Sequence, residues 1–183
     1  LYNQKHFSFE VKANKLITGN FTAGIGSRYE YLKYSPEIET FPRVYGKINF
    51  LTGFVDLHFN NLNSPSYPNS GNIIDFEAGV NYNQHPDFKY DDGNSATPQS
   101  SPLFSKKAYY SIKYYSAHYL PIHKHSLFFK LHSGVHFGNK QPFLNDFIVG
   151  GNDLVIRNQI LFPGFRTNSI FSSSVIAPQV GLH

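Results

Sequence analysis

The sequence has 183 residues, about the length of one domain, and its lack of cysteine excludes disulfides and thiol chemistry. Aromatic residues make up 17% of it and charged residues only 15%, against roughly 25% charged residues in average soluble domains. The formal charge of +4 comes from lysines and arginines that are scattered rather than clustered, so we expect no nucleic-acid partner.

The N-terminal part of the chain alternates between apolar and polar residues, the pattern of β-strands whose two faces meet different surroundings. Residues 6–12 alternate in this way, and residues 13–15 then predict a short turn. Residues 16–34 continue the alternation as one strand, with Ile25 on the apolar side and Arg28 on the polar side. This predicted strand is far longer than the usual five or six residues, roughly, of strands in soluble proteins.

The alternation resumes after a loop with two prolines at residues 35–42. Residues 43–60 form the next predicted strand. A change of phase near residues 51–53 predicts a bulge there or, alternatively, a tight hairpin. Residues 61–71 are dense in turn-forming residues, and residues 72–83 alternate cleanly.

The next part of the chain begins with a long polar loop at residues 84–105. A strand at residues 106–119 and a turn at residues 121–125 follow it. Residues 126–137 show the clearest alternation, with Phe129 on the apolar side and polar residues between the apolar ones. These patterns predict two further antiparallel strands joined by a turn.

A long connection at residues 138–169 precedes a last predicted strand at residues 170–183. Connections of this length are usually functional or disordered. Disordered segments are poor in aromatic and aliphatic residues, whereas this connection is rich in both. We therefore expect it to adopt a defined structure.

These segments give about seven strands and no helix, with shorter turns alternating with longer loops. Transmembrane β-barrels combine antiparallel strands of at least about nine residues, short turns at one end and longer loops at the other. A soluble β-sandwich explains the alternation equally well, but neither the strand length nor the asymmetry of the connections. The predicted fold is therefore all-β, an antiparallel transmembrane β-barrel, with the apolar face toward lipid and the polar face toward the lumen.

The chain begins at Leu1, contains no methionine and ends at His183 within a predicted strand. About seven strands are too few to close a barrel. We therefore expect residues 1–183 to be part of one outer-membrane barrel domain of a longer protein.

Three segments, taken in order, resemble the outer-membrane assembly-factor superfamily, which includes BamA-like insertases, two-partner secretion pores and the barrels of patatin-like phospholipases. The first is the turn Asn61-Leu62-Asn63-Ser64-Pro65-Ser66-Tyr67-Pro68-Asn69-Ser70-Gly71. The second is Tyr119-Leu120-Pro121-Ile122 with the strand that follows, and the third is the loop containing Gly150-Gly151 and Arg157. The resemblance implies that these strands are roughly the sixth to twelfth of a sixteen-strand barrel.

The resemblance also implies that the connection at residues 138–169 folds back into the lumen and is held there by Arg157. In the superfamily this arginine binds acidic residues of the inner wall, which would come here from strands after His183. The alternative is a solvent-exposed loop arginine. The residues that we expect to lock the loop are Arg157, Gly150, Gly151, Phe162, Gly164 and Phe165.

This sequence departs from the superfamily pattern, because Ile156-Arg157 is followed by Asn158-Gln159 rather than by Gly and an aromatic residue. The Gly-Gly pair and the later Phe162-Pro163-Gly164-Phe165 are more similar to the barrel that follows a patatin-like phospholipase domain in Bacteroidetes-type proteins.

Neither catalysis nor metal binding is predicted within these residues, and no cofactor is expected. Patatin-like enzymes carry their serine in G-x-S-x-G, and the nearest string, Gly24 to Arg28, does not match it. The histidines His123, His125, His132 and His136 do not form a convergent set, so we interpret them as solvated residues of a turn and of the wet face. Asp91-Asp92-Gly93 lacks the other ligands of a calcium loop and reads as a surface turn.

The resemblance implies a bacterial outer-membrane location, outer-membrane lipid as a partner, and the barrel module of a patatin-like phospholipase that anchors or exports an upstream hydrolase domain. A BamA-like insertase or secretion pore, with client or passenger proteins as partners, is one alternative. A porin-like channel constricted by residues 138–169 is the other.

Overall fold

The computed structural model describes residues 2–36, 43–91, 105–140, 145–150, 158–160 and 170–182. Within these ranges the chain forms a seven-stranded sheet and a separate three-stranded sheet. Every neighbouring pair in the larger sheet is antiparallel. The predicted all-β, antiparallel class is therefore confirmed, while the sheet of the described residues is open rather than closed into a barrel.

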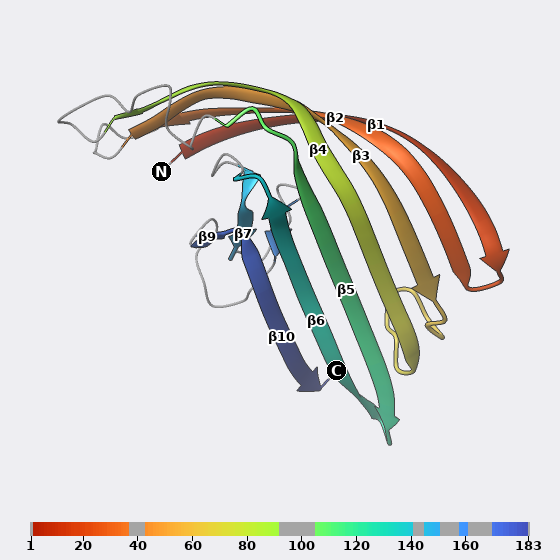
Figure 1. Cartoon of the computed structure of the whole chain (residues 1–183). Coiled ribbons are helices and arrows are strands. Elements are labelled where there is room, and N and C mark those ends of the chain that lie inside the picture. The colour runs from red at the N-terminus through yellow and green to blue at the C-terminus, as the bar shows by residue number, and fades with distance from the viewer. Residues whose placement is uncertain are drawn as a thin grey trace.

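The larger sheet follows chain order, and its strands arch together over one concave side (Figure 1). Its strands are β1 (Tyr2–Thr18), β2 (Phe21–Pro36), β3 (Arg43–Asn60), β4 (Gly71–Asp91), β5 (Tyr109–Ile122), β6 (His125–Gly138) and β10 (Ser174–Leu182). The longest, β4, has 21 residues. Strands of this length are several times longer than the roughly five or six residues usual in soluble proteins.

The smaller sheet is formed by β7 (Phe147–Val149), β8 (Gln159–Ile160) and β9 (Ile170–Ser172). β7 pairs with β8 in parallel and with β9 antiparallel. Figure 1 shows β7 and β9 on the concave side of the larger sheet, beside the C-terminal end of β6. This placement brings part of the long connection against the wall formed by the strands.

The two faces of the larger sheet differ because residues that pair across strands point to the same side. One pairing row joins Ile25 to Val55, Val55 to Ala78, and Ala78 to Ile112. Another row, three residues along each strand, joins Arg28 to Thr52 and Thr52 to Asn81. We call the two sides the apolar face and the polar face, and the face assignment of residues 126–137 from the sequence is confirmed.

The first hairpin lies elsewhere than predicted. Residues 13–15 belong to β1, and the turn is at Gly19-Asn20, so residues 16–34 are not one strand. A two-residue Gly-Asn connection is a common hairpin turn. Asn14 stays in the strand because it pairs with Gly24, which leaves room for its side chain.

The change of phase in β3 is neither a hairpin nor a bulge in that strand. β3 pairs with β2 without interruption, and the bulge lies in β4, where Asn83 and Gln84 face Phe50. The φ of Asn83 is 52°, a conformation that asparagine tolerates better than most residues. The apparent slip arose because apolar residues of β3 also occupy the polar face, where Phe50 and Phe54 are buried.

Three other boundaries were predicted wrongly. β4 continues to Asp91, so the start of the predicted loop at residues 84–105 is strand. The turn between β5 and β6 is only His123-Lys124, and His123 has a positive φ of 54°. The last predicted strand is two elements, because the chain breaks at Ser173 between β9 and β10 and each piece joins a different sheet.

The two ends of the larger sheet carry connections of different length. At one end, which we call the turn end, the connections are residues 19–20, 61–70 and 123–124. At the other, the loop end, β2 ends at residue 36 and β3 begins at 43, and β4 ends at 91 and β5 begins at 109. The predicted alternation of shorter and longer connections is confirmed only in part, because the ten residues 61–70 at the turn end outnumber the six between β2 and β3 at the loop end.

Candidate functional site

Of the six residues expected to lock the long connection, the structure describes Gly150. Its φ is 126°, a conformation that favours glycine. Its amide donates a 3.1 Å hydrogen bond to the carbonyl of Ile160, and its own carbonyl accepts one of 2.8 Å from Gln159. Arg157, Gly151, Phe162, Gly164 and Phe165 lie outside the described residues.

The contact between the connection and the wall centres on Phe147. Its ring occupies the space above Gly134, where any Cβ would overlap it. The ring also stacks on His136, with the centroids 4.3 Å apart and the planes 9° from parallel. Gly134 and His136 are both on the polar face of β6. The connection is therefore packed onto that face by a buried aromatic stack.

Polar groups add a second attachment. The Nδ2 of buried Asn145 donates a 3.2 Å hydrogen bond to Gln84 of the β4 bulge. Gln84 in turn donates to the carbonyl of Lys107, and Asn158 donates to the carbonyl of Asn145 at 3.0 Å. Buried amides need hydrogen-bond partners. The bulge in β4 places the Gln84 side chain where it can accept from Asn145, and this fixes the position of the connection on the sheet.

The polar face also carries an arginine, Arg28, that is ion-paired to acidic residues of the sheet, as the sequence analysis expected of Arg157. The Nε of Arg28 binds Glu10 at 2.5 Å, and its Nη2 binds Glu77 at 2.9 Å. The guanidinium lies 4.4 Å from the ring centroid of Phe54, and the side chain is only 8% exposed. Lys113 contacts Glu77 at 3.3 Å. These residues link five neighbouring strands across the wall.

Glycines make this crossing physically possible. Phe54 lies over Gly26 and Gly79, and Lys12 crosses Gly24 to reach Asp56, with 2.6 Å between the charged atoms. A Cβ at Gly24 would overlap the side chain of Lys12, and one at Gly26 would overlap the ring of Phe54. The string around Gly24 and Gly26, which resembled a nucleophile motif only weakly, thus serves packing within β2.

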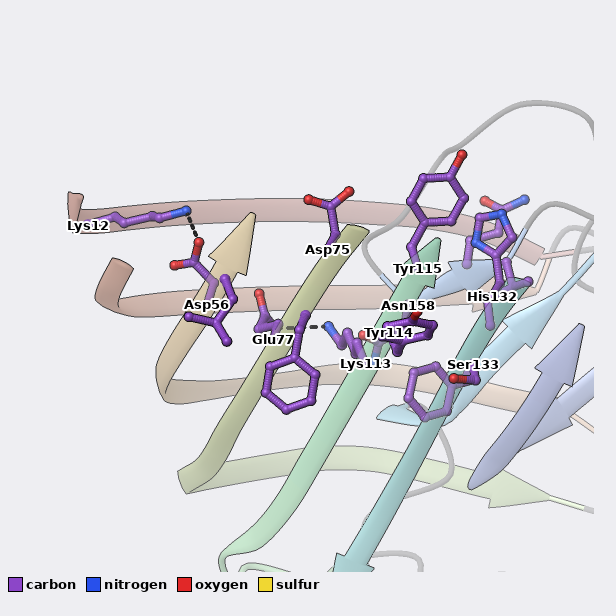
Figure 2. Close-up of a pocket in the computed structure, with 15 residues that line it drawn as sticks. Lys12, Asp56, Asp75, Glu77, Lys113, Tyr114, Tyr115, His132, Ser133 and Asn158 are labelled. Carbon is purple, nitrogen blue, oxygen red and sulfur yellow. Dashed lines mark hydrogen bonds and ion pairs between the residues drawn. The ribbon is translucent and has the colours of Figure 1, made fainter. Parts of the chain in front are cut away.

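Between the wall and residues 158–160 lies an open hollow of about 360 Å³ (Figure 2). Its wall side carries Asp56, Asp75, Glu77 and Lys113, and Asn158 borders it from the other side. In Figure 2 the dashed lines join Lys12 to Asp56 and Lys113 to Glu77. The lining of the hollow is mixed: most of its charged side chains form the two ion pairs above, while Phe147 and Ile160 add apolar surface.

The histidines occupy three different settings. His123 and His125 are exposed at the turn end, and His132 packs against Tyr115 with 4.5 Å between ring centroids. His136 is on the polar face, as predicted, but it is buried under Phe147 rather than solvated. Among the described residues, no group of three or more His, Asp and Glu side chains is placed to hold a metal ion.

The sequence analysis missed Arg28, Glu77 and Gln84 as key residues. Arg28 was placed on the polar side, yet pairing it with Glu77 requires the register of the three strands β2, β3 and β4. One feature of the sequence could have indicated this network, because acidic and basic residues occupy the polar face of consecutive strands. The first of them, Glu10 and Arg28, are directly opposite each other on β1 and β2. Such cross-strand pairs stabilise sheets.

Comparison with models of known families finds no match for this chain, and comparison with curated proteins finds no significant relative. Across the described ranges, no helix has the length and apolar character needed to cross a membrane.

Proposed function

We propose that this chain forms neighbouring strands of a sixteen-strand outer-membrane β-barrel, with residues 145–150 and 158–160 inside the lumen. The barrel would be the module of a patatin-like phospholipase that anchors or exports a hydrolase domain encoded upstream. The wall itself carries no part of the hydrolysis in this proposal, and its polar face serves to hold the inner segment.

The main support for a membrane location is the distribution of charged residues between the two faces of the larger sheet. On the apolar face of strands β2 to β6, no Asp, Glu, Lys or Arg lies between the row of Lys33, Lys47 and Asp87 at the loop end and the turns at the other end. Large side chains on this face are exposed, among them Ile25 at 65% and Phe129 at 44%. A soluble monomer rarely exposes an apolar surface that is continuous over so many strands.

The uncharged part of the apolar face, which we call the uncharged band, is about as tall as the apolar layer of an outer membrane is thick. On β2 it runs from Phe21 to Tyr31, roughly 33 Å along the strand at about 3.3 Å per residue. At a tilt of about 40° this corresponds to about 25 Å, the height of the apolar band of outer-membrane barrels. Tyr29, Tyr31 and Tyr82 lie toward its loop end, where such barrels carry an aromatic girdle.

The open edges of the sheet support closure by further strands. β1 and β10 are the two edges of the larger sheet. Lipid cannot bind free backbone N–H and C=O groups, and so a membrane sheet must close on itself. In this proposal the missing strands come from parts of the protein outside these residues.

The packing of the connection favours a plugged barrel over an open, porin-like channel. Phe147 and Ile148 are buried, and Asn145 is hydrogen-bonded into the wall. An insertase or secretion pore of the same superfamily remains the second candidate, because a segment seated on the inner wall is common to both. The choice of the phospholipase module rests on the resemblance around Gly150-Gly151 and Phe162-Pro163-Gly164-Phe165.

The membrane proposal is tested with nitroxide labels on two matched serines. Ser27→Cys lies on the apolar face and Ser8→Cys on the polar face, and both positions are exposed. In the reconstituted full-length protein, freed of other cysteines, the label at residue 27 should relax faster with oxygen, which dissolves in lipid. The label at residue 8 should respond to a water-soluble nickel complex. Equal nickel accessibility at both sites would refute a lipid-facing surface.

The choice between modules is tested by activity of the full-length protein. A patatin-like module predicts release of fatty acid from phospholipid, abolished by a fluorophosphonate that modifies reactive serines. An insertase predicts no release, together with faster folding of a client barrel protein into vesicles that contain the protein.

A further inference from the structure

At the loop end of the apolar face, charged residues from four adjacent strands lie in one row. Lys5 pairs with Lys33, Lys33 with Lys47, and Lys47 with Asp87, so that all four point to the same side. The three lysines are exposed. We call Lys5, Lys33 and Lys47 the lysine row.

This arrangement is costly for the protein alone. Directly opposed like charges destabilise a sheet, because their Cβ atoms are only about 4.5–5.5 Å apart. Within the described part of the chain, Asp87 is the only carboxylate paired with the row, at 3.7 Å from Lys47, and both of those side chains are largely exposed. An anionic partner would offset the repulsion between the remaining ammonium groups.

The position of the row indicates which anion. It lies two residues beyond Phe7 and Tyr31, which belong to the aromatic end of the uncharged band. Lipid headgroups begin where that band ends, and ammonium groups at this level attract anionic headgroups. A soluble polyanion would not need the row to stand at the edge of a surface that binds acyl chains.

We propose that the lysine row binds the phosphate groups of a phosphorylated lipid in the leaflet at the loop end, with its acyl chains against the apolar face below. Two or more ammonium groups on neighbouring strands suit a lipid that carries two phosphates. This inference rests on the proposed membrane location and adds a specific lipid contact to it.

The test uses the full-length protein in detergent micelles, with native mass spectrometry to count bound molecules of diphosphorylated lipid A. The variant Lys5→Gln/Lys33→Gln removes two lysines that take part in no ion pair of the described residues, so the fold should be retained. Its matched control is Lys15→Gln/Lys124→Gln, two exposed lysines toward the turn end. We expect the row variant to bind lipid A roughly tenfold more weakly and the control to bind like the wild type.

The probes separate the sources of phosphate. Dephosphorylated lipid A should bind wild type and row variant equally, and inorganic phosphate at the same concentration should not compete. Equal lipid A binding by row variant and wild type would overturn the proposal, as would displacement by inorganic phosphate or by a short DNA oligonucleotide. If the label at residue 27 faces lipid but the variants bind lipid A equally, only this inference fails. If that label faces water, the membrane proposal fails as well.

Discussion

The ring of Phe147 occupies the volume that a side chain at position 134 would need, so that Gly134 forms a socket for residues 145–150. The two residues lie on different sheets, and the socket is completed by His136, which stacks on the same ring. A glycine in a strand often marks such a close approach.

Gly134→Val should therefore release residues 145–150 from the wall without disturbing the strands. Overpacking of this kind costs about 1–3 kcal/mol. We expect faster trypsin cleavage after the exposed Lys140 and a lower temperature for the mobility shift of the folded protein on semi-native gels. Gly53→Val is the control, because a Cβ there meets only ordinary contacts at 3.9 Å. Similar cleavage rates for both variants would argue against the socket.

Arg28→Met should destabilise the wall by leaving Glu10 and Glu77 without their shared cation. Breaking a buried ion pair costs about 3–5 kcal/mol, and the lower end is expected here because the Glu10 side chain is 35% exposed. The urea midpoint of unfolding in micelles measures the loss. Lys47→Met, which breaks an exposed pair, should cost about 0–1 kcal/mol. Adding Glu10→Gln to Arg28→Met should recover part of the loss, whereas Glu77 keeps Lys113 as a partner.

If the apolar face contacts lipid as proposed, a lysine on that face should impair insertion far more than one on the polar face. Phe129 and His132 are three residues apart on β6 and point to opposite faces. A lysine at the membrane midplane costs about 2–4 kcal/mol, and less near the interfaces. Phe129→Lys should therefore reduce the folded fraction in vesicles, while His132→Lys should be tolerated. Equal folding of both variants would reverse or abolish the face assignment.

Arg157→Ala tests the residue that the sequence analysis expected to lock the long connection. If Arg157 is paired with a carboxylate of the larger sheet or its neighbours, its loss should lower the heat resistance of the folded protein on semi-native gels. Arg166→Ala, at the other arginine of the same connection, is the control. An unchanged transition for Arg157→Ala would favour a solvent-exposed arginine.

The sequence was sufficient for most of the long strands of the larger sheet and for the two faces of the regular ones. Side chains of a strand alternate with a period of two, so the pattern around Leu127 and Phe129 assigned the faces of β6 without knowledge of any neighbour. Boundaries were less predictable, as the early turn and the extension of β4 to Asp91 illustrate. Asn14 and His85 are permitted in both turns and strands, and only their pairing with β2 and β3 decides between them.

The sequence by itself determined an all-β chain with one apolar and one polar side, because that information is local and repeats along each strand. Only the tertiary structure decided that Arg28 reaches Glu77, that Gln84 holds Asn145 and that Gly134 receives Phe147. These contacts depend on the register between strands and on the volume that opposing side chains leave free. Neither quantity is encoded in any one segment, so each emerges only when distant segments are brought together.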